Sequence, residues 1–330
     1  MAERTLLSMT APLREDFAIP YHDIGDPQRR PRAAFVAGVS GTEINGIFVL
    51  ARLASFLANV AAGGHPTQQL TERVLVVPAV NLLGVNTRSG PWPFDRTNIN
   101  RMFPGYDAGE TTQRVAWALL SATRDAHYRI DVRSSNLDFE ELPQVRLYEP
   151  RSEEREDACL FGLPAVIERP INRLYTSTLT YAWRAYGGEN FVVQAGQAGY
   201  LQRHHSERLF RALVAFLQRT GILRGPELSQ EEEDLHYFGP RQAVPLLAER
   251  AGMFVSRLDV GVWIQAGDVI GHIYDAFDGS IRAEVRAPVA GLLTGLRRQP
   301  LLCQGDLMAR LHTLRPVADI HDEHLHDQGQ

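Results

Sequence analysis

Hydrophobic and polar positions follow two patterns along roughly the first 225 residues, and each pattern predicts a different kind of element. Short apolar runs, typical of buried parallel strands, recur between longer stretches that have the 3.6-residue period of an amphipathic helix. This order predicts a mostly parallel sheet flanked by helices. The strands are expected at 33–39, 73–78, 128–132, 144–148 and 190–194, and the helices at 43–62, 111–127, 176–186 and 206–220.

Turn and cap residues mark where some of these elements end. Ser206 is expected to cap the last helix at its N-terminus, and Gly221 is expected to end it. Residues 82–110 show neither pattern and are rich in Gly, Pro and Asn, so they are expected to form a long loop. A loop of that length inside a compact domain usually has a function.

The pattern changes again after residue 223. Residues 224–239 are expected to be an acidic linker, 240–313 a small all-β domain, and 314–330 a polar tail that is disordered rather than a metal site. Within the β-rich part, residues 265–271 are echoed by residues 303–309, which favours a barrel-sandwich like that of lipoyl and biotinyl carriers. The chain contains no lysine, so the carrier role is excluded and only that architecture is expected.

Composition narrows the class of partner. The 330 residues carry a formal net charge of -5, so neither nucleic acid nor a membrane is expected as a partner. The N-terminus lacks the apolar core of a secretory signal, and the 2 cysteines lie far apart, so a cytoplasmic location is expected.

Four short segments carry the candidate chemistry, and three of them lie at the C-terminal ends of predicted strands, where open α/β sheets place their sites. They are Gly-Val-Ser-Gly-Thr-Glu at 38–43, Asn-Ile-Asn-Arg-Met-Phe-Pro-Gly at 98–105, Asp-Val-Arg at 131–133 and Gln-Ala-Gly at 194–196. In this order they resemble the succinylglutamate desuccinylase/aspartoacylase family of zinc carboxypeptidase-like deacylases. The resemblance covers nearly the whole chain. It implies a carboxypeptidase-like mixed sheet flanked by helices in residues 1–223, followed by the small barrel-sandwich domain.

The resemblance also assigns a role to each segment, and here the chain departs from the family. The family's first motif, Gly-x-His-Gly-x-Glu, holds zinc through its His and Glu, and these positions are Ser40 and Glu43 here. The family's third motif supplies the last zinc ligand, a His, and this position is Arg133. The fourth supplies the general base, a Glu, and this position is Gln194.

The second segment keeps more of the family pattern. Asn100 and Arg101 match the pair that binds the substrate carboxylate, and Arg88 falls near a second substrate-binding arginine. A guanidinium can clamp a carboxylate with two hydrogen bonds, so these three residues are expected to bind a small anionic ligand. An alternative is that Arg101 only braces the 82–110 loop.

A catalytic zinc needs three ligands of the His, Cys or carboxylate type, and only Glu43 qualifies here. Arginine stays protonated and has no lone pair to offer, and glutamine cannot accept a proton. We therefore expect neither zinc nor another cofactor. We also expect that Arg133 forms an ion pair with Glu43 where the metal would lie, with Ser40 and Gln194 completing the hydrogen bonds. The alternative is that Arg133 points to solvent.

Other residues could restore catalysis in a remodelled site. His127 or the His204–His205 pair could replace a metal ligand, and Ser40 loosely resembles a nucleophile elbow. The first hypothesis is a pseudoenzyme that binds a small carboxylate or serves as a partner subunit, with another protein or further copies of itself. The alternative is an active deacylase or amide hydrolase that uses zinc or a new nucleophile.

Overall fold

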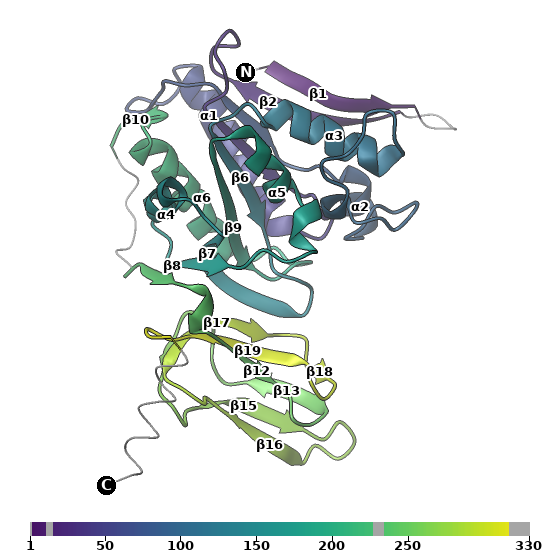
Figure 1. The fold of residues 1–330 in the computed structure, drawn as a ribbon, viewed down its shortest axis with the longest axis vertical. Coiled ribbons are helices and arrows are strands. Elements are labelled where there is room, and N and C mark those ends of the chain that lie inside the picture. The colour runs from purple at the N-terminus through teal and green to yellow at the C-terminus, as the bar shows by residue number, and fades with distance from the viewer. Residues whose placement is uncertain (1, 11–15, 227–233, 317–330) are drawn as a thin grey trace.

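The computed structural model describes residues 2–10, 16–226 and 234–316, which form a large mixed sheet with helices on both faces and a smaller β-rich part (Figure 1). Most of the predicted polar tail and the middle of the predicted acidic linker lie outside the described residues.

The centre of the large sheet confirms the predicted parallel strands. β5 (Val74–Val77), β3 (Ala33–Ala37), β6 (Tyr128–Arg133) and β9 (Glu189–Gly196) lie side by side and run parallel. The edges make the sheet mixed, because β7 (Phe139–Tyr148) runs antiparallel to β9 and β2 (Phe17–Ile24) runs antiparallel to β5. β1 (Ala2–Met9) pairs with β2 in an antiparallel hairpin. This hairpin was not predicted.

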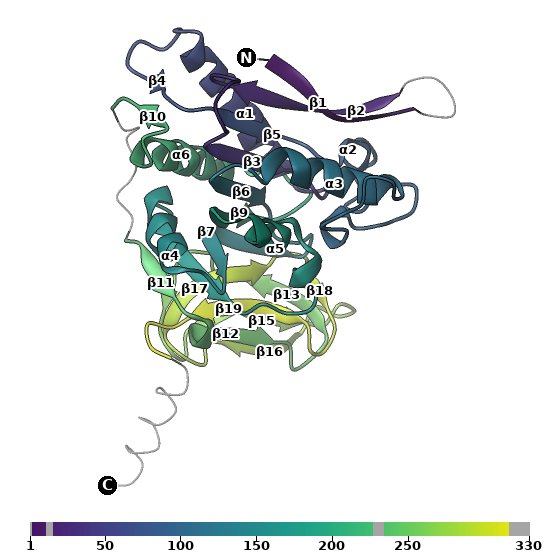
Figure 2. The same cartoon turned by 45° about the horizontal axis from the view of Figure 1, so that its top comes forward.

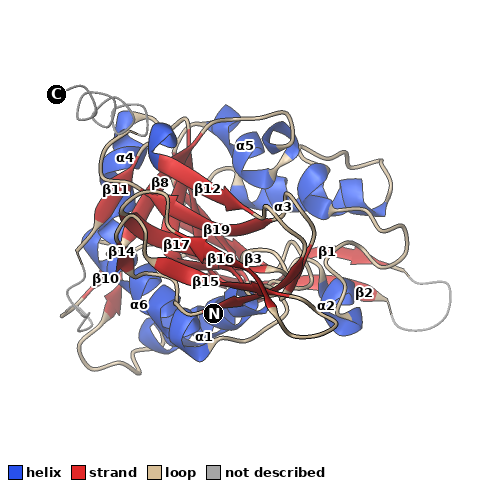
Figure 3. Ribbon diagram, turned by 90° about the horizontal axis from the view of Figure 1, so that it is seen from below, coloured by secondary structure: helices blue, strands red, loops and turns tan. Residues whose placement is uncertain are grey.

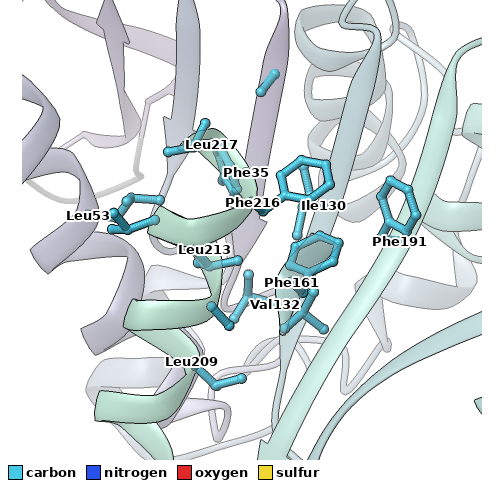
Figure 4. Close-up of a cluster of buried hydrophobic side chains, with 14 of the residues drawn as sticks. Phe35, Leu53, Ile130, Val132, Phe161, Phe191, Leu209, Leu213, Phe216 and Leu217 are labelled. Atoms are coloured by element: carbon cyan, nitrogen blue, oxygen red, sulfur yellow. The ribbon is translucent and has the colours of Figure 1, made fainter. Parts of the chain in front are cut away.

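Helices cover both faces of this sheet (Figure 2). α1 (Ile44–Ala61), α4 (Ser152–Ala158) and α6 (Arg203–Arg219) pack on one face, and α3 (Thr111–Thr123) and α5 (Leu179–Trp183) pack on the other. Successive strand residues point to opposite faces, so Phe35 joins the first core and Val36 the second. Figure 4 shows Phe35, Leu53, Leu213 and Phe216 packed in the first core.

α1 has the length and the mean hydropathy, 1.6, of a helix that could cross a membrane. In this fold 44% of it is buried, and Leu50, Leu53 and Leu57 belong to the core between the sheet and α6. These residues explain its apolar character as that of a core helix.

Three local predictions need correction. α6 begins at Arg203, and Ser206 is not its cap but a buried residue whose hydroxyl donates to Asn45 Oδ1 at 3.2 Å. The helix predicted at 176–186 is broken into the short helix α5 and the two 3-10 turns that flank it. The segment 82–110 is not wholly irregular, because it contains α2 (Leu82–Thr87) and the 3-10 turn η1 (Ile99–Arg101).

The β-rich part consists of two sheets, whose strands Figure 3 shows from below. A separate apolar core lies between them. One sheet contains β17 (Gly291–Arg297), β19 (Leu307–His312) and β12 (Ala243–Leu247), and the other has the order β16-β15-β13-β18. β17 also pairs with β7, so the first of these sheets continues the large sheet of the α/β part. The pairing of β17 with β7 places β19, the neighbour of β17, close to the C-terminal ends of the parallel strands.

The remaining elements are short or belong to the second sheet: β4 (Gln69–Leu70), β8 (Ala165–Arg169), β10 (Leu223–Arg224), β11 (His236–Phe238), β13 (Gly252–Ser256), β14 (Trp263–Ile264), β15 (Val269–Tyr274), β16 (Ile281–Arg286), β18 (Leu301–Leu302), η2 (Cys159–Phe161), η3 (Tyr175–Ser177), η4 (Arg184–Tyr186) and η5 (Pro240–Gln242).

Candidate functional site

A cleft of about 590 Å³ lies where the parallel strands end and β19 approaches them. Residues from all four candidate segments line it, together with residues from β7, β8 and β19. The lining includes Ser40, Glu43, Asn100, Arg101, Arg133, Glu141, Arg146, Arg169, Gln194 and Arg310. The fold therefore brings together every predicted site residue except Arg88.

The turn after β3 places Ser40 and Glu43 in this cleft. Gly41 permits the turn, because a Cβ there would lie 2.3 Å from the backbone of Gly84 and 2.3 Å from the carbonyl oxygen of Ser89. The backbone N–H of Ser40 donates to Glu43 Oε2 at 3.3 Å. The Ser40 hydroxyl pairs with Thr42 Oγ1 at 3.1 Å, and no histidine lines the cleft among the described residues. Ser40 therefore has no partner that could activate it as a nucleophile.

Arg133, at the end of β6, confirms the predicted ion pair with Glu43. Its Nε lies 3.4 Å from Glu43 Oε1 and 3.3 Å from Asp131 Oδ2. Asp131 is fully buried and was not among the predicted site residues. A signal for it was present in the sequence, because residues two apart on a strand point to the same face.

One guanidinium thus serves two buried carboxyl groups. Burial raises the pKa of Glu43 to about 7, although Arg133 opposes the shift. Burial also raises the pKa of Asp131, and Arg133 again opposes this. For Arg133, burial acts to lower the pKa, but the two carboxylates raise it above its ordinary value. Arg133 therefore stays charged, and the proton that titrates near neutral pH belongs to the carboxyl pair.

Gln194 departs from the prediction. It is buried in β9, but its side-chain amide donates to Glu141 of β7 rather than to Glu43 or Arg133. Glu141 is also paired with Arg146 and with Arg310 of β19. Burial would raise the pKa of Glu141, but the neighbouring arginines lower it below its ordinary value. The proposed hydrogen-bonding role of Gln194 beside Glu43 was therefore wrong.

The 98–105 segment brings Asn100 and Arg101 to the cleft. Asn98 Oδ1 accepts a hydrogen bond from the Asn100 N–H at 2.9 Å, and Asn100 Oδ1 accepts one from Leu179 N–H at 3.1 Å. Arg101 is exposed and donates through Nη1 to the carbonyl oxygen of Leu174. Asn100 thus fixes the loop, while Arg101 keeps other guanidinium donors for a ligand.

Arg88 lies elsewhere. It is the exposed C-terminal cap of α2, with a left-handed backbone at φ 54, and it is not among the residues that line the cleft.

The histidines considered as replacement ligands are also outside the cleft. His205 bonds Glu140 at 2.8 Å, and both line a second cavity of about 750 Å³ together with His204. Glu140 and Glu141 are neighbours on β7, so they point to opposite faces. His127 precedes β6, at the end away from Arg133, and pairs with Glu189 at 3.2 Å.

A catalytic zinc does not fit the residues at the cleft. In the described part of the chain, no three side chains of the His, Cys, Asp or Glu type are grouped so that they could hold a metal ion. Glu43 and Asp131 could supply oxygen ligands, but Arg133 lies within ion-pair distance of both carboxylates. A guanidinium in that place repels a dication and offers it no lone pair.

Comparison with known proteins shows which family the chain belongs to. Residues 29–219, more than half of the chain, match the model of the succinylglutamate desuccinylase/aspartoacylase catalytic domain. The chain belongs to this family. It is 24% identical over 290 residues to the N-alpha-acetyl-L-2,4-diaminobutyric acid deacetylase of Halomonas elongata, covering 84% of this chain and 81% of the relative.

Solved structures share the fold over almost the same length. The product-bound ectoine utilization protein EutE (DoeB) from Ruegeria pomeroyi superposes with a TM-score of 0.73 and 21% identity, covering 90% of this chain and 89% of that one. A succinylglutamate desuccinylase/aspartoacylase from Rhodobacter sphaeroides gives 0.72 and 21% over the same shares, 90% and 89%. The predicted α/β fold with a β-rich C-terminal part is thereby confirmed.

Proposed function

We propose that this member of a deacylase family binds a small carboxylate-bearing molecule in the cleft and does not hydrolyse it by the family's zinc chemistry. The observation that carries the proposal is the ion pair between Arg133 and Glu43, with Nε and Oε1 3.4 Å apart. The Arg133 guanidinium thereby holds a permanent positive charge beside Glu43, the position that the family uses to hold zinc.

The position of the family's general base supports the same proposal. Gln194 has no basic oxygen of carboxylate type, and its neighbour Glu141 is paired with Arg146 and Arg310. A carboxylate whose pKa is held low by two guanidinium groups is a poor proton acceptor for a water molecule.

Ligand binding rests on Arg101 and the loop that Asn100 fixes. Arg101 is exposed at the cleft, and one of its nitrogens is used by the Leu174 carbonyl. The remaining guanidinium donors match a carboxylate, for which two parallel hydrogen bonds are the preferred geometry.

One observation favours the alternative of an active hydrolase. Glu43 has a pKa of about 7, which suits a group that exchanges protons near neutral pH. Against this, its oxygens already face the Arg133 guanidinium and the Ser40 N–H. A water activated by Glu43 would also lack a cation that stabilises the developing oxyanion, unless Arg133 serves for it.

The test is to purify the full chain, dialyse it against zinc, and measure metal content, acetate release from N-alpha-acetyl-L-2,4-diaminobutyric acid, and acetate binding by calorimetry. We expect less than about 0.1 zinc per chain, no acetate release above buffer, and acetate binding that Arg101→Gln weakens. Stoichiometric zinc, or release that Glu43→Gln abolishes, would support the hydrolase instead. Co-purification of an active relative would identify a partner subunit.

A further inference from the structure

Three arginines meet at the side of the cleft where β7, β8 and β19 approach each other. They are Arg146, Arg169 and Arg310, which come from both parts of the protein. The side chains of Arg146 and Arg310 are only 14% and 19% exposed, and both contact Glu141 Oε1. Two of the three guanidinium groups therefore share one carboxylate.

Arg169 has no carboxylate within ion-pair distance among the described residues. Its Nε and Nη2 are buried and have no hydrogen-bond partner in this part of the chain, and the same is true of Arg146 Nε. Burying a charged donor without a partner is costly, so in native proteins such a group calls for a specific explanation, of which a bound ion is one.

The charge count of the cluster is uneven. Arg146, Arg169 and Arg310 contribute three positive charges, and Glu141 contributes one negative charge, which leaves an excess of two. Burial and the two neighbouring arginines lower the pKa of Arg169 to about 10, which still leaves it charged at neutral pH. The nearby His312 is fully buried, and burial together with these arginines lowers its pKa to about 3, so it adds no charge.

We infer that Arg146, Arg169 and Arg310 form a second anion subsite of the cleft, which takes a doubly charged oxyanion group of the ligand. Guanidinium groups bind carboxylate and phosphate oxygens in the same forked geometry, so the group is a phosphoryl group or a pair of carboxylates. A phosphoryl group carries about -1.5 to -2 charges at neutral pH and three acceptor oxygens, and either source offsets the excess.

This inference rests on the proposed function only in that one ligand would span the cleft from Arg101 to Arg169. The two subsites use different residues, so they can fail separately. Arg101 does not contact Glu141, and the orphaned donors belong to Arg146 and Arg169.

The test is calorimetric titration of the full chain with inorganic phosphate, malonate and acetate at constant ionic strength. We expect phosphate or malonate to bind at least about tenfold more tightly than acetate, since they carry the second charge. Arg169→Gln and, independently, Arg310→Gln should weaken that binding by about tenfold or more. Arg52→Gln is the control, because Arg52 pairs with Glu207 on the exposed surface of α1 and α6.

A second readout separates ligand binding from a structural role. Arg169→Gln removes one of three crowded cations, so its ligand-free form should have a higher melting temperature than the natural protein. The variant should also lose the rise in melting temperature that phosphate or malonate produces. A purely structural arginine would instead lower the melting temperature when replaced. If Arg169→Gln does not fold, Arg310→Gln tests the loss of the anion-induced rise alone, because its replacement also breaks the ion pair with Glu141 and lowers the stability of the ligand-free protein.

The outcomes are distinct. Phosphate binding alone would assign a phosphoryl ligand, and malonate binding alone a dicarboxylate. Equal binding of all three anions, or unchanged binding in both variants, would overturn the second subsite. If acetate still binds through Arg101 in that case, the proposed function stands without it. If phosphate binds but Arg101→Gln leaves the affinity for acetate unchanged, the second subsite stands and the proposed carboxylate site fails.

Discussion

Asp131 and Arg133 lie two residues apart on β6, and Arg133 Nε is 3.3 Å from Asp131 Oδ2 as well as 3.4 Å from Glu43 Oε1. The three side chains together carry one positive and two negative charges when all are ionised. Because all three are largely buried, the excess negative charge is costly and favours a proton on one carboxyl group. This arrangement links the ionisation of the cleft to the stability of the fold.

Removal of the shared cation should expose that cost. Arg133→Met leaves Glu43 and Asp131 buried without a positive partner, so we expect a loss of about 3–5 kcal/mol in the free energy of unfolding at pH 8. The loss should shrink at pH 5, because Glu43 is then protonated and burial also raises the pKa of Asp131. Urea denaturation at the two pH values measures it. Arg52→Met, which breaks the exposed pair with Glu207, is the control and should cost about 0–1 kcal/mol. An equal loss at both pH values would contradict the shared-cation account.

Glu43 itself should make stability fall as the pH rises. Its pKa is raised from 4.5 to about 7 in the folded protein. Below its ordinary pKa of 4.5, the Glu43 carboxyl is protonated in both the folded and the unfolded protein, and its contribution to stability is complete. That contribution is lost as the pH rises through the folded pKa of about 7. Glu43→Gln cannot titrate, so it should gain stability relative to the natural protein between pH 5 and 8, by on the order of 3 kcal/mol. Parallel pH–stability curves for the two proteins would count against the raised pKa.

The sequence predicted the centre of the fold well because the signals there are local. The run at 33–39 is apolar on both faces, which is typical of a buried parallel strand. The run at 128–132 is also buried on both faces, although Arg129 and Asp131 alternate there with apolar residues. The strands β1 and β2 were missed, since the residues of β2 alternate in burial only weakly. The pairing of β17 with β7 could not be predicted, because it joins residues about 150 positions apart through backbone hydrogen bonds.

The site was predictable where motif residues carried the chemistry. The ion pair of Glu43 and Arg133 was predicted because a buried carboxylate needs a positive partner, and Arg133 stands where the resemblance implies a metal ligand. The role of Gln194 was not predictable, because its partner Glu141 comes from a strand that enters the cleft only through the tertiary fold. Arg169 and Arg310 stand in no motif, and only the approach of β8 and β19 brings them together.

Gly41 should be essential for the position of Glu43. A Cβ at residue 41 would lie 2.3 Å from backbone atoms of Gly84 and Ser89, so Gly41→Ala must displace the turn. We expect a cost of about 1–3 kcal/mol in unfolding free energy, measured by urea denaturation. The control is Gly239→Ala, because the nearest atom to a Cβ there is Gln242 Oε1 at 3.5 Å. A cost no larger than that of the control would show that the turn adapts.

Arg101 and Arg88 should differ in their effect on ligand binding. Arg101 lines the cleft and Arg88 does not, although both are exposed arginines near the same loop. We expect Arg101→Gln to raise the dissociation constant for acetate by about tenfold, the effect of one lost charge-assisted hydrogen bond. Arg88→Gln should leave it unchanged in the same calorimetric titration. A similar loss in both variants would mean that the loop moves and brings Arg88 to the ligand.

Imidazole donors at residues 40 and 133 should create a metal site, because the chain belongs to the family and shares its fold. The variant Ser40→His combined with Arg133→His gives Glu43 two imidazole partners and removes the competing guanidinium. We expect about one zinc per chain after dialysis, against less than about 0.1 for the natural protein, measured by metal analysis. Ser40→His alone keeps Arg133 beside Glu43 and should bind no more zinc than the natural protein. Equal zinc content in the natural protein and the double variant would mean that Arg133 does not block the metal, and the proposed loss of zinc chemistry would then be wrong.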